Sequence, residues 1–301
     1  MSTKFRLDHI TRDASEQNFL QRQLEQVRAE AYLTKFEMFQ ARELMNIDNS
    51  IDPGAEEKTV WITEYVGQAE LTSDYSTRGP RADVKRREAK FRIRGIKASY
   101  GYSMQEARNS IYSRGSLPQD KANSARRIIE ARIEKTLMEG SLVAGVTGIA
   151  NNPDVSTATL ANGNWTTATP DEIMADLGTM VSTIRTATLR NHKPTTVALA
   201  SNLYTKLMIT PRSTLTNMSV LAWLQEQLKL TFIDVGYLED TTAKLIMYDN
   251  SPMVVQGLIP QEFEQLPPQP EGFETVTQCH ARCGGAAVYI PSAMLYAAPT
   301  L

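Results

Sequence analysis

The hydrophobic pattern changes period along the chain, and each change predicts a different element. From Thr59 to Tyr102 apolar and polar residues alternate with period two, which is typical of strands with one exposed face. The two predicted strands are "TVWITEYVGQAEL" and "AKFRIRGIKASYGYS", joined by the turn-rich loop "TSDYSTRGP". A two-stranded excursion with so little apolar surface is marginal in water, so we expect it to lie on a neighbour.

The second of these strands is strongly basic on one side. By alternation Phe91 and Ile93 face one way, and the opposite face carries Lys90, Arg92 and Arg94. Gly95 interrupts the alternation and predicts a bulge. Because the only interleaved aromatic lies opposite the arginines, the strand does not resemble a stacking platform for nucleic acid.

Helical periodicity predicts three longer helices. Residues 15–45 predict a long or broken amphipathic helix at the head of an arm. A capping box at 103–106 starts a helical turn, and a helix of about six turns follows over 118–139, with Gly140 as its stop. A second capping box at 169–172 starts a helix that ends near Arg190. The predicted buried stripes of the last two helices are Ala122, Ala125, Ile129, Ile133 and Leu137, then Ile173, Leu177, Met180, Val181 and Ile184.

The remaining apolar runs are short and predict an α+β fold. "TTVALA" reads as a strand, Ser201 is predicted to cap a short helix, and "SVLAWLQEQLK" predicts another helix. The strands that follow are "LTFIDVG", "AKLIMYD", "MVVQGLI" and "TVTQCHARCGGAAVYIP". We therefore expect a compact body with an extended arm and an extended hairpin.

Charge is unevenly distributed although the chain has a net charge of only −2. Residues 78–103 carry nine Lys/Arg and two Asp/Glu, whereas residues 234–276 carry eight Asp/Glu and one Lys. Two interpretations stay open at this point. The two windows are solvated faces that never meet, or they are electrostatic partners. A chain specialised for nucleic acid would more often be basic overall.

No motif for catalysis, for a cofactor or for a metal is found in the sequence. His9, His192 and His280 have no metal-ligand spacing, and phosphate-binding, dinucleotide-binding and nucleophile-elbow motifs are absent. Cys279 and Cys283 are expected on one face of a strand, about 13 Å apart and too distant for a disulfide. We expect no enzyme activity, no cofactor and no metal, and a reducing compartment. The polar start and the absence of a long apolar run predict a soluble protein made in a cytoplasm, with no membrane contact.

The order of elements resembles that of tailed-bacteriophage major capsid proteins of the Hong Kong ninety-seven, or encapsulin-like, fold. The segments that carry the resemblance are "GPRADV", "ASYGYSMQEARNS", "ARRIIEARIEKTLMEG", "GIANNPDV" and the closing "GGAAVYIPSAMLYAAP". The resemblance implies an N-arm over 1–52, an E-loop hairpin over 53–102 and a P-domain with a spine helix over 103–164. It further implies an A-domain over 165–250, return strands of the P-domain over 251–291 and an A-domain end over 292–301.

The resemblance implies a structural function for the chain. It implies hexamers and pentamers that assemble into an icosahedral shell around phage double-stranded DNA, in a virion capsid assembled in the host cytoplasm. Implied partners are other copies of the chain, a portal protein, scaffold or decoration proteins, and packaged DNA contacted nonspecifically. A lysine–asparagine crosslink known in relatives has no matching pair here. The rival hypotheses are an encapsulin-type nanocompartment shell, and a nucleic-acid-binding or enzymatic protein unrelated to capsids.

Taken with the charge pattern, this gives a hypothesis about assembly. An under-stabilised hairpin makes sense if its burial is intermolecular, and closed shells form from many repeated contacts. We expect the basic residues to meet acidic groups of adjacent subunits, including the 234–276 region. The expected contact residues are Arg78, Arg81, Lys85, Arg86, Arg87, Lys90, Arg92 and Arg94.

Overall fold

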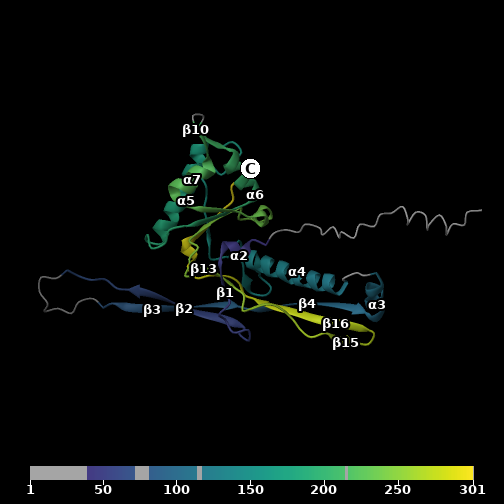
Figure 1. Cartoon of the computed structure of the whole chain (residues 1–301). Coiled ribbons are helices and arrows are strands. Elements are labelled where there is room, and N and C mark those ends of the chain that lie inside the picture. Colours follow the sequence, from purple (N-terminus) through teal and green to yellow (C-terminus); the bar gives the residue numbers. More distant parts are fainter. Residues whose placement is uncertain (1–38, 72–80, 114–116, 214–215, 301) are drawn as a thin grey trace, which may run out of the picture. The chain divides into compact units, whose positions relative to one another are not determined.

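The computed structural model describes residues 39–71, 81–113, 117–213 and 216–300, all within the unit from Phe39 to Leu301 (Figure 1). Most of the predicted arm helix over 15–45 lies outside the described residues. Its described end contains the short helix α2 (Ala41–Leu44), which begins beside α4 (Leu117–Met138). The Glu134 carboxylate of α4 accepts hydrogen bonds from the backbone N–H groups of Gln40 and Ala41, both at 2.7 Å. These bonds satisfy N–H groups that a helix start leaves without partners.

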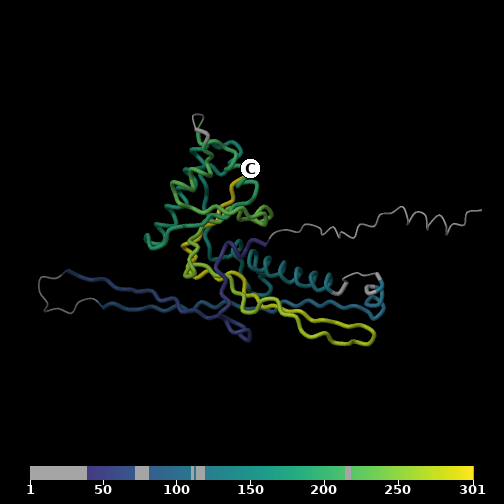
Figure 2. The backbone as a smooth tube through the Cα atoms, in the orientation of Figure 1, coloured from purple at the N-terminus to yellow at the C-terminus, as the bar shows by residue number. Residues whose placement is uncertain are grey.

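A four-stranded sheet and the long helix α4 form the first layer pair. The sheet has the order β14–β16–β15, and β4 also pairs with β16 along ten residues. Its strands are β4 (Arg94–Ser103), β14 (Gln261–Gln265), β15 (Gln269–Glu271) and β16 (Glu274–Cys283). Figure 2 shows the chain leaving β4 through α3 (Met104–Ser113) and returning along the sheet through α4.

The predicted caps and stripe explain why α3 and α4 begin and end where they do. At the start of α3, Ser103 N donates to Glu106 Oε2 at 2.9 Å and Glu106 N donates to Ser103 Oγ at 3.1 Å, which confirms the first capping box. Gly140, with φ +73°, allows the turn that ends α4. The α4 stripe is confirmed as core: Ala125, Ile129, Ile133 and Leu137 are buried, and Ala122 is half-buried.

Period two along β16 places its two cysteines in the core against this helix layer. Thr277, Cys279, Ala281 and Cys283 are buried, while His280 on the opposite face is half-buried. Both cysteines are free, as predicted. Burial raises the pKa of the Cys283 thiol to about 11, so this thiol stays protonated and unreactive at neutral pH.

The second lobe is built on a five-stranded sheet of order β11–β8–β12–β18–β7. The sheet strands are β7 (Ser156–Thr157), β8 (Thr196–Leu199), β11 (Thr231–Asp234), β12 (Leu245–Tyr248) and β18 (Met294–Ala297). Its helices are α5 (Pro170–Ala187), α6 (Ser201–Ile209), α7 (Val220–Leu228) and the 3₁₀ turns η1 (Gly236–Asp240) and η2 (Pro291–Ala293). A small hairpin joins β9 (Pro211–Ser213) to β10 (Thr216–Ser219).

The predicted capping box of α5 is confirmed, whereas the predicted Ser201 cap of α6 is wrong. Thr169 and Glu172 form the reciprocal capping box, with Pro170 as the first helical residue. The predicted α5 stripe is buried except for Val181, which is half-buried. Ser201 was expected to cap α6, but it is the first helical residue and its hydroxyl donates to Asp234 Oδ1 at 2.5 Å. The hydroxyl therefore links α6 to β11 rather than capping the helix.

A third, small sheet joins the described start of the chain to its last third. It has the order β1–β13–β17, with β1 (Asn46–Asp48), β13 (Val255–Leu258) and β17 (Gly285–Val288). Beside it lies the short pair β5 (Gly140–Ser141) and β6 (Val146–Thr147). Gly285, with φ +70°, begins β17 where an added Cβ would collide with the Thr147 carbonyl oxygen, which explains the second glycine of the predicted "GG" strand.

The predicted two-stranded excursion is shorter than the sequence pattern suggested. The hairpin consists of β2 (Glu57–Val66) and β3 (Asp83–Arg92), which pair antiparallel over ten residues (Figure 1). Residues 94–103 were expected to continue it, but they form β4 and pair with β16. The change of partner occurs at the buried Ile93, whose N–H donates to Glu56 O at 2.8 Å. Gly95 pairs with Arg282 in regular register, so the bulge predicted there was wrong.

Candidate assembly surface

The β2–β3 hairpin exposes an aromatic and basic face. Trp61 lies opposite Glu88, Thr63 opposite Arg86, and Tyr65 opposite Val84. Cross-strand partners share a face of a sheet, so these six side chains lie together. Trp61 is 63% exposed and Tyr65 is 87% exposed. Exposed aromatics of this size on the same face as an arginine are typical of a surface that a partner covers.

The opposite face of the hairpin contacts the body near its base, and further along Ile62, Glu64 and Arg87 line a pocket with second-lobe residues that include Thr188, His192 and Pro291. Phe91 packs edge-on against Tyr289, with 5.4 Å between ring centroids and an interplanar angle of 89°. Lys58, the cross-strand partner of Phe91, directs its ammonium to Asp48 Oδ2 at 2.6 Å and to Tyr289 OH at 2.8 Å. Beyond Ile62 on β2 and Ala89 on β3, which are half-buried, the side chains of the two strands are exposed.

Hydrogen bonding explains the electrostatics of this base. Although burial acts in the opposite direction, hydrogen bonds from Lys58 and Ser50 lower the pKa of Asp48 to about 2. Burial lowers the pKa of Lys58, but its bonds to Asp48 and Tyr289 outweigh burial and raise that pKa above the ordinary value. The pair is therefore ionised at neutral pH, and it ties β2 to β1 and β17.

The eight predicted contact residues do not form a single surface. Arg78 lies outside the described residues, and Arg81 is exposed two residues before β3 begins. Arg86, Lys90 and Arg92 lie on the aromatic face, whereas Lys85 and Arg87 lie on the other. Lys90 approaches Glu88 at 3.6 Å and Arg92 approaches Glu57 at 3.5 Å. Within the part of the chain that the structure describes, Lys85, Arg86 and Arg87 form no ion pair.

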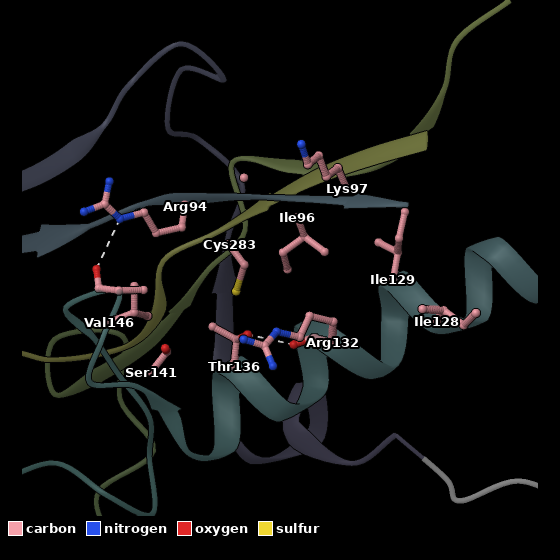
Figure 3. Close-up of a pocket in the computed structure, with 12 residues that line it drawn as sticks. Arg94, Ile96, Lys97, Ile128, Ile129, Arg132, Thr136, Ser141, Val146 and Cys283 are labelled. Carbon is pink, nitrogen blue, oxygen red and sulfur yellow. Dashed lines mark hydrogen bonds between the residues drawn. The ribbon is translucent and has the colours of Figure 1, made fainter. Parts of the chain in front are cut away.

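Arg94 departs from the prediction that grouped it with Lys90 and Arg92. It begins β4 and, with its Nε donating to Ala144 O at 3.1 Å, it lines a pocket between β4 and α4 (Figure 3). Alternation does not extend from Arg92 to Arg94, because the strand changes its pairing partner between these two residues. The pocket has a volume of about 410 Å³.

Five of the eight acidic residues over 234–276 fall into two groups. Asp234, Glu239 and Asp249 accept hydrogen bonds inside the second lobe, from Ser201, Asn202 and His192 respectively. Glu271 and Glu274 face each other across the β15–β16 turn, are exposed, and have no ion-pair partner among the described residues. Only part of the negative charge seen in the sequence is therefore free to meet a partner.

Among the described residues no cluster of three or more His, Cys, Asp or Glu side chains could hold a metal ion. His192 is paired with Asp249, with 3.0 Å between Nδ1 and Oδ2, and His280 lies 3.0 Å from Gln261 Nε2. No helix in the described ranges is long and apolar enough to cross a membrane. The exposed hairpin, rather than any of these groups, is the prominent candidate site.

Comparison with known proteins identifies the class. A family model described as "Major capsid protein" matches residues 67–298, and the chain belongs to this family. Comparison with curated proteins gave no match. The capsid of Myoviridae phage XM1 is similar in structure, with a TM-score of 0.82, 14% identity, and coverage of 93% of this chain and 98% of that one. A structure from Mycobacterium phage Ogopogo gives a TM-score of 0.64 with 12% identity, covering 92% of this chain and 97% of that one.

These findings confirm the predicted α+β phage capsid fold, and with it a structural rather than enzymatic function. The chain is a major capsid protein with the fold of phage capsid subunits, and copies of it form a capsid shell. A virus-like particle from Pyrococcus furiosus shares the fold at a TM-score of 0.52 and 14% identity, covering 85% of this chain and 90% of that one. The encapsulin-type alternative is not better supported than the phage capsid.

Proposed function

We propose that the β2–β3 hairpin is the element by which each capsid subunit holds its neighbour, and that its basic residues meet acidic groups of adjacent copies. The contact set is Arg78, Arg81, Lys85, Arg86, Arg87, Lys90, Arg92 and Arg94. The observation that carries the proposal is the exposure of Trp61 and Tyr65 on the same hairpin face as Arg86, which has no ion-pair partner among the described residues.

The aromatic and basic residues have different tasks in this contact. Exposed ion pairs contribute only about 0–1 kcal/mol each, so the arginines alone would hold a neighbour weakly. Burial of an exposed Trp or Tyr contributes about 3 kcal/mol before the costs of association. Trp61 and Tyr65 therefore supply most of the affinity. The cations around them orient the encounter and disfavour wrong registers.

The same contact repeated around symmetry axes produces the shell. In our proposal, hexamers and pentamers close into an icosahedral particle that encloses double-stranded DNA, with packaged DNA contacted nonspecifically. Assembly takes place in the host cytoplasm, with a portal protein and, where present, scaffold or decoration proteins as further partners. The near-neutral net charge of −2 supports subunit contact rather than DNA binding as the main task of the basic strand.

We further propose family domain names for the segments of the chain. The β2–β3 hairpin is the E-loop, α4 is the spine helix of the P-domain, and the five-stranded sheet with α5, α6 and α7 is the A-domain. In this proposal the E-loop ends at Arg92 and β4 belongs with the P-domain sheet, which the pairing of β4 with β16 supports.

The test is simultaneous charge reversal of Arg86 and Arg87 to Glu. We expect particle assembly to fail while the subunit keeps its circular dichroism spectrum and melting temperature, because both side chains are exposed. Replacement of both residues by Lys is the matched control, since it keeps the charge and is expected to retain assembly. Replacement of both exposed residues Lys193 and Lys229 by Glu changes the net charge by the same −4 and controls for net charge. Normal shells from the Arg86→Glu, Arg87→Glu variant would overturn the proposal.

A further inference from the structure

The pocket between β4 and α4 combines an apolar floor with two arginines. Ile96, Ile129, Val146 and Cys283 line its interior, and Figure 3 shows Ile96 and Cys283 pointing into the space between strand and helix. Arg94 and Arg132 lie at its edge, and Ile128, which is 61% exposed, lies at its mouth. Lys97 belongs to the same stretch of β4, but Figure 3 shows its side chain pointing away from α4.

Neither arginine has a carboxylate partner within the described residues. Arg94 donates through Nε to Ala144 O, which leaves the outer nitrogens of its guanidinium available. Arg132 is one helical turn from Ile128 and is exposed. A pocket of about 410 Å³ is near the lower end of the range for binding cavities, so it suits one anchor side chain with a carboxylate beside it.

One exposed turn of the chain presents an aromatic side chain with carboxylates beside it. At the β15–β16 turn, Gly272 adopts φ +65° and Phe273 is 83% exposed. Glu271 and Glu274 pair across this turn, so an aromatic side chain is flanked by two carboxylates without partners among the described residues. The Phe273 carbonyl accepts a hydrogen bond from Met104 N at 3.0 Å, which anchors the turn to the start of α3. The turn is therefore an ordered knob rather than a free loop.

We propose that the Phe273 turn of one copy inserts into the β4–α4 pocket of a second copy, with Glu271 and Glu274 meeting Arg94 and Arg132. Charge complementarity and the apolar floor together favour this occupant. A nucleic-acid phosphate would use the arginines but leave the floor uncovered. The inference rests on the proposed function in one respect. Arg94 belongs to the contact set proposed above, and the inference names the acidic residues that it meets. It otherwise concerns a surface separate from the hairpin.

Disulfide cross-linking between two introduced cysteines detects this contact directly. Ile128→Cys and Phe273→Cys are combined in a chain that also carries Cys283→Ala, because the free Cys283 thiol lines the same pocket and could react with the introduced cysteine. The single variants and the control pair carry the same Cys283→Ala change. Particles are assembled and mildly oxidised, and the products are separated without reductant. Each copy carries both partners, so we expect a ladder of dimers and larger multimers that is absent from either single variant. Phe273→Cys combined with Leu189→Cys, which is exposed in the second lobe, is the control pair. Particles without a ladder would overturn the inference, as would dimers from Phe273→Cys alone, which would show that the turns meet each other.

A charge exchange keeps the inference falsifiable if the cysteine variants do not assemble. Arg132→Glu and Glu274→Arg are each expected to lower particle yield about tenfold, and their combination is expected to restore it, because coupled residues are not additive. Wild-type yield from Arg132→Glu with reduced DNA content would instead indicate a phosphate site and contradict the proposal. Failure here leaves the hairpin proposal standing, because Arg86 and Arg87 are tested by separate variants.

Discussion

The ammonium of Lys58 lies 2.6 Å from the Asp48 carboxylate, and this bond joins the base of the β2–β3 hairpin to the first strand of the small sheet. Both side chains are largely removed from water, with exposed fractions of 20% and 11%. A pair with this geometry holds the base of the hairpin against the small sheet. The exposed part of the hairpin can therefore reach a neighbour without first being ordered.

Acid should weaken this attachment over a defined pH window. The pKa of Asp48 is lowered to about 2 in the folded chain, from an ordinary 3.8. The stabilisation is therefore complete above about pH 4 and is lost as pH falls through 2. We expect wild type to exceed Asp48→Asn in unfolding free energy by about 1–2 kcal/mol at pH 6 and by little at pH 2. Chemical denaturation across this range measures the difference, and a gap independent of pH would contradict it.

Removal of the exposed aromatics should affect assembly without affecting the subunit. Trp61→Ser together with Tyr65→Ser is expected to leave the unfolding free energy of the subunit within about 0.5 kcal/mol, because neither side chain is buried. Particle yield by sedimentation should fall strongly. Leu142→Ser, a change at another exposed apolar residue, is the matched control and should assemble. Equal yields from the double variant and the control would count against the hairpin as the main contact.

The attachment of residues 40–44 to the body should depend on the Glu134 side chain. Its side chain accepts hydrogen bonds from the N–H groups of Gln40 and Ala41 in a nearly buried position. Glu134→Ala would leave both donors without a partner and should cost about 1–3 kcal/mol. Glu134→Gln keeps an acceptor oxygen and should cost less. Hydrogen exchange at residues 40–44 should accelerate in the alanine variant, and unchanged exchange would argue against this role.

Two glycines should respond in opposite directions to the same substitution. Gly285 has φ +70° and no room for a Cβ next to the Thr147 carbonyl, so Gly285→Ala is expected to destabilise the subunit by more than about 2 kcal/mol. Gly178 lies within α5 with no atom near its would-be Cβ, so Gly178→Ala should stabilise by about 0.5–1 kcal/mol. Thermal melts of the two variants check both signs, and a harmless Gly285→Ala would contradict the close approach described here.

A polar core contact gives a further test of the second lobe. Asp176 is 2% exposed and accepts hydrogen bonds at 3.2 Å from Asn162 N and from the buried Trp165 Nε1. Asp176→Ala should cost about 2–4 kcal/mol and shift the fluorescence of Trp165. Glu226→Ala, an exposed carboxylate on α7, is the control and should change neither. An unaltered melting temperature for Asp176→Ala would contradict the contact.

Local patterns predicted those elements whose signals are also local. The capping boxes, the α4 and α5 stripes and the shared face of Cys279 and Cys283 follow from spacings of a few residues, and the structure confirms them. The change of partner at Ile93 could not be predicted in this way. Period two continues from β3 into β4, and only the distant β16 determines where one pairing ends and the other begins.

The sequence prediction of the candidate site included its basic residues but missed its exposed aromatic residues, Trp61 and Tyr65. Trp61, Thr63 and Tyr65 alternate onto one side of β2, so the sequence contained a signal for two aromatics on a solvated strand face. The pocket between β4 and α4 had no such signal. Arg94, Arg132 and Cys283 come together only through the packing of helix on sheet, which no local spacing encodes.

An electron cryomicroscopy reconstruction of the assembled wild-type particle tests the assembly contact most directly. We predict that the β2–β3 hairpin of each copy lies on an adjacent subunit, with Trp61 and Tyr65 buried at that contact and Arg86 facing acidic side chains. A hairpin that projects into solvent, or that folds back onto its own subunit with both aromatics uncovered by a neighbour, would contradict this account.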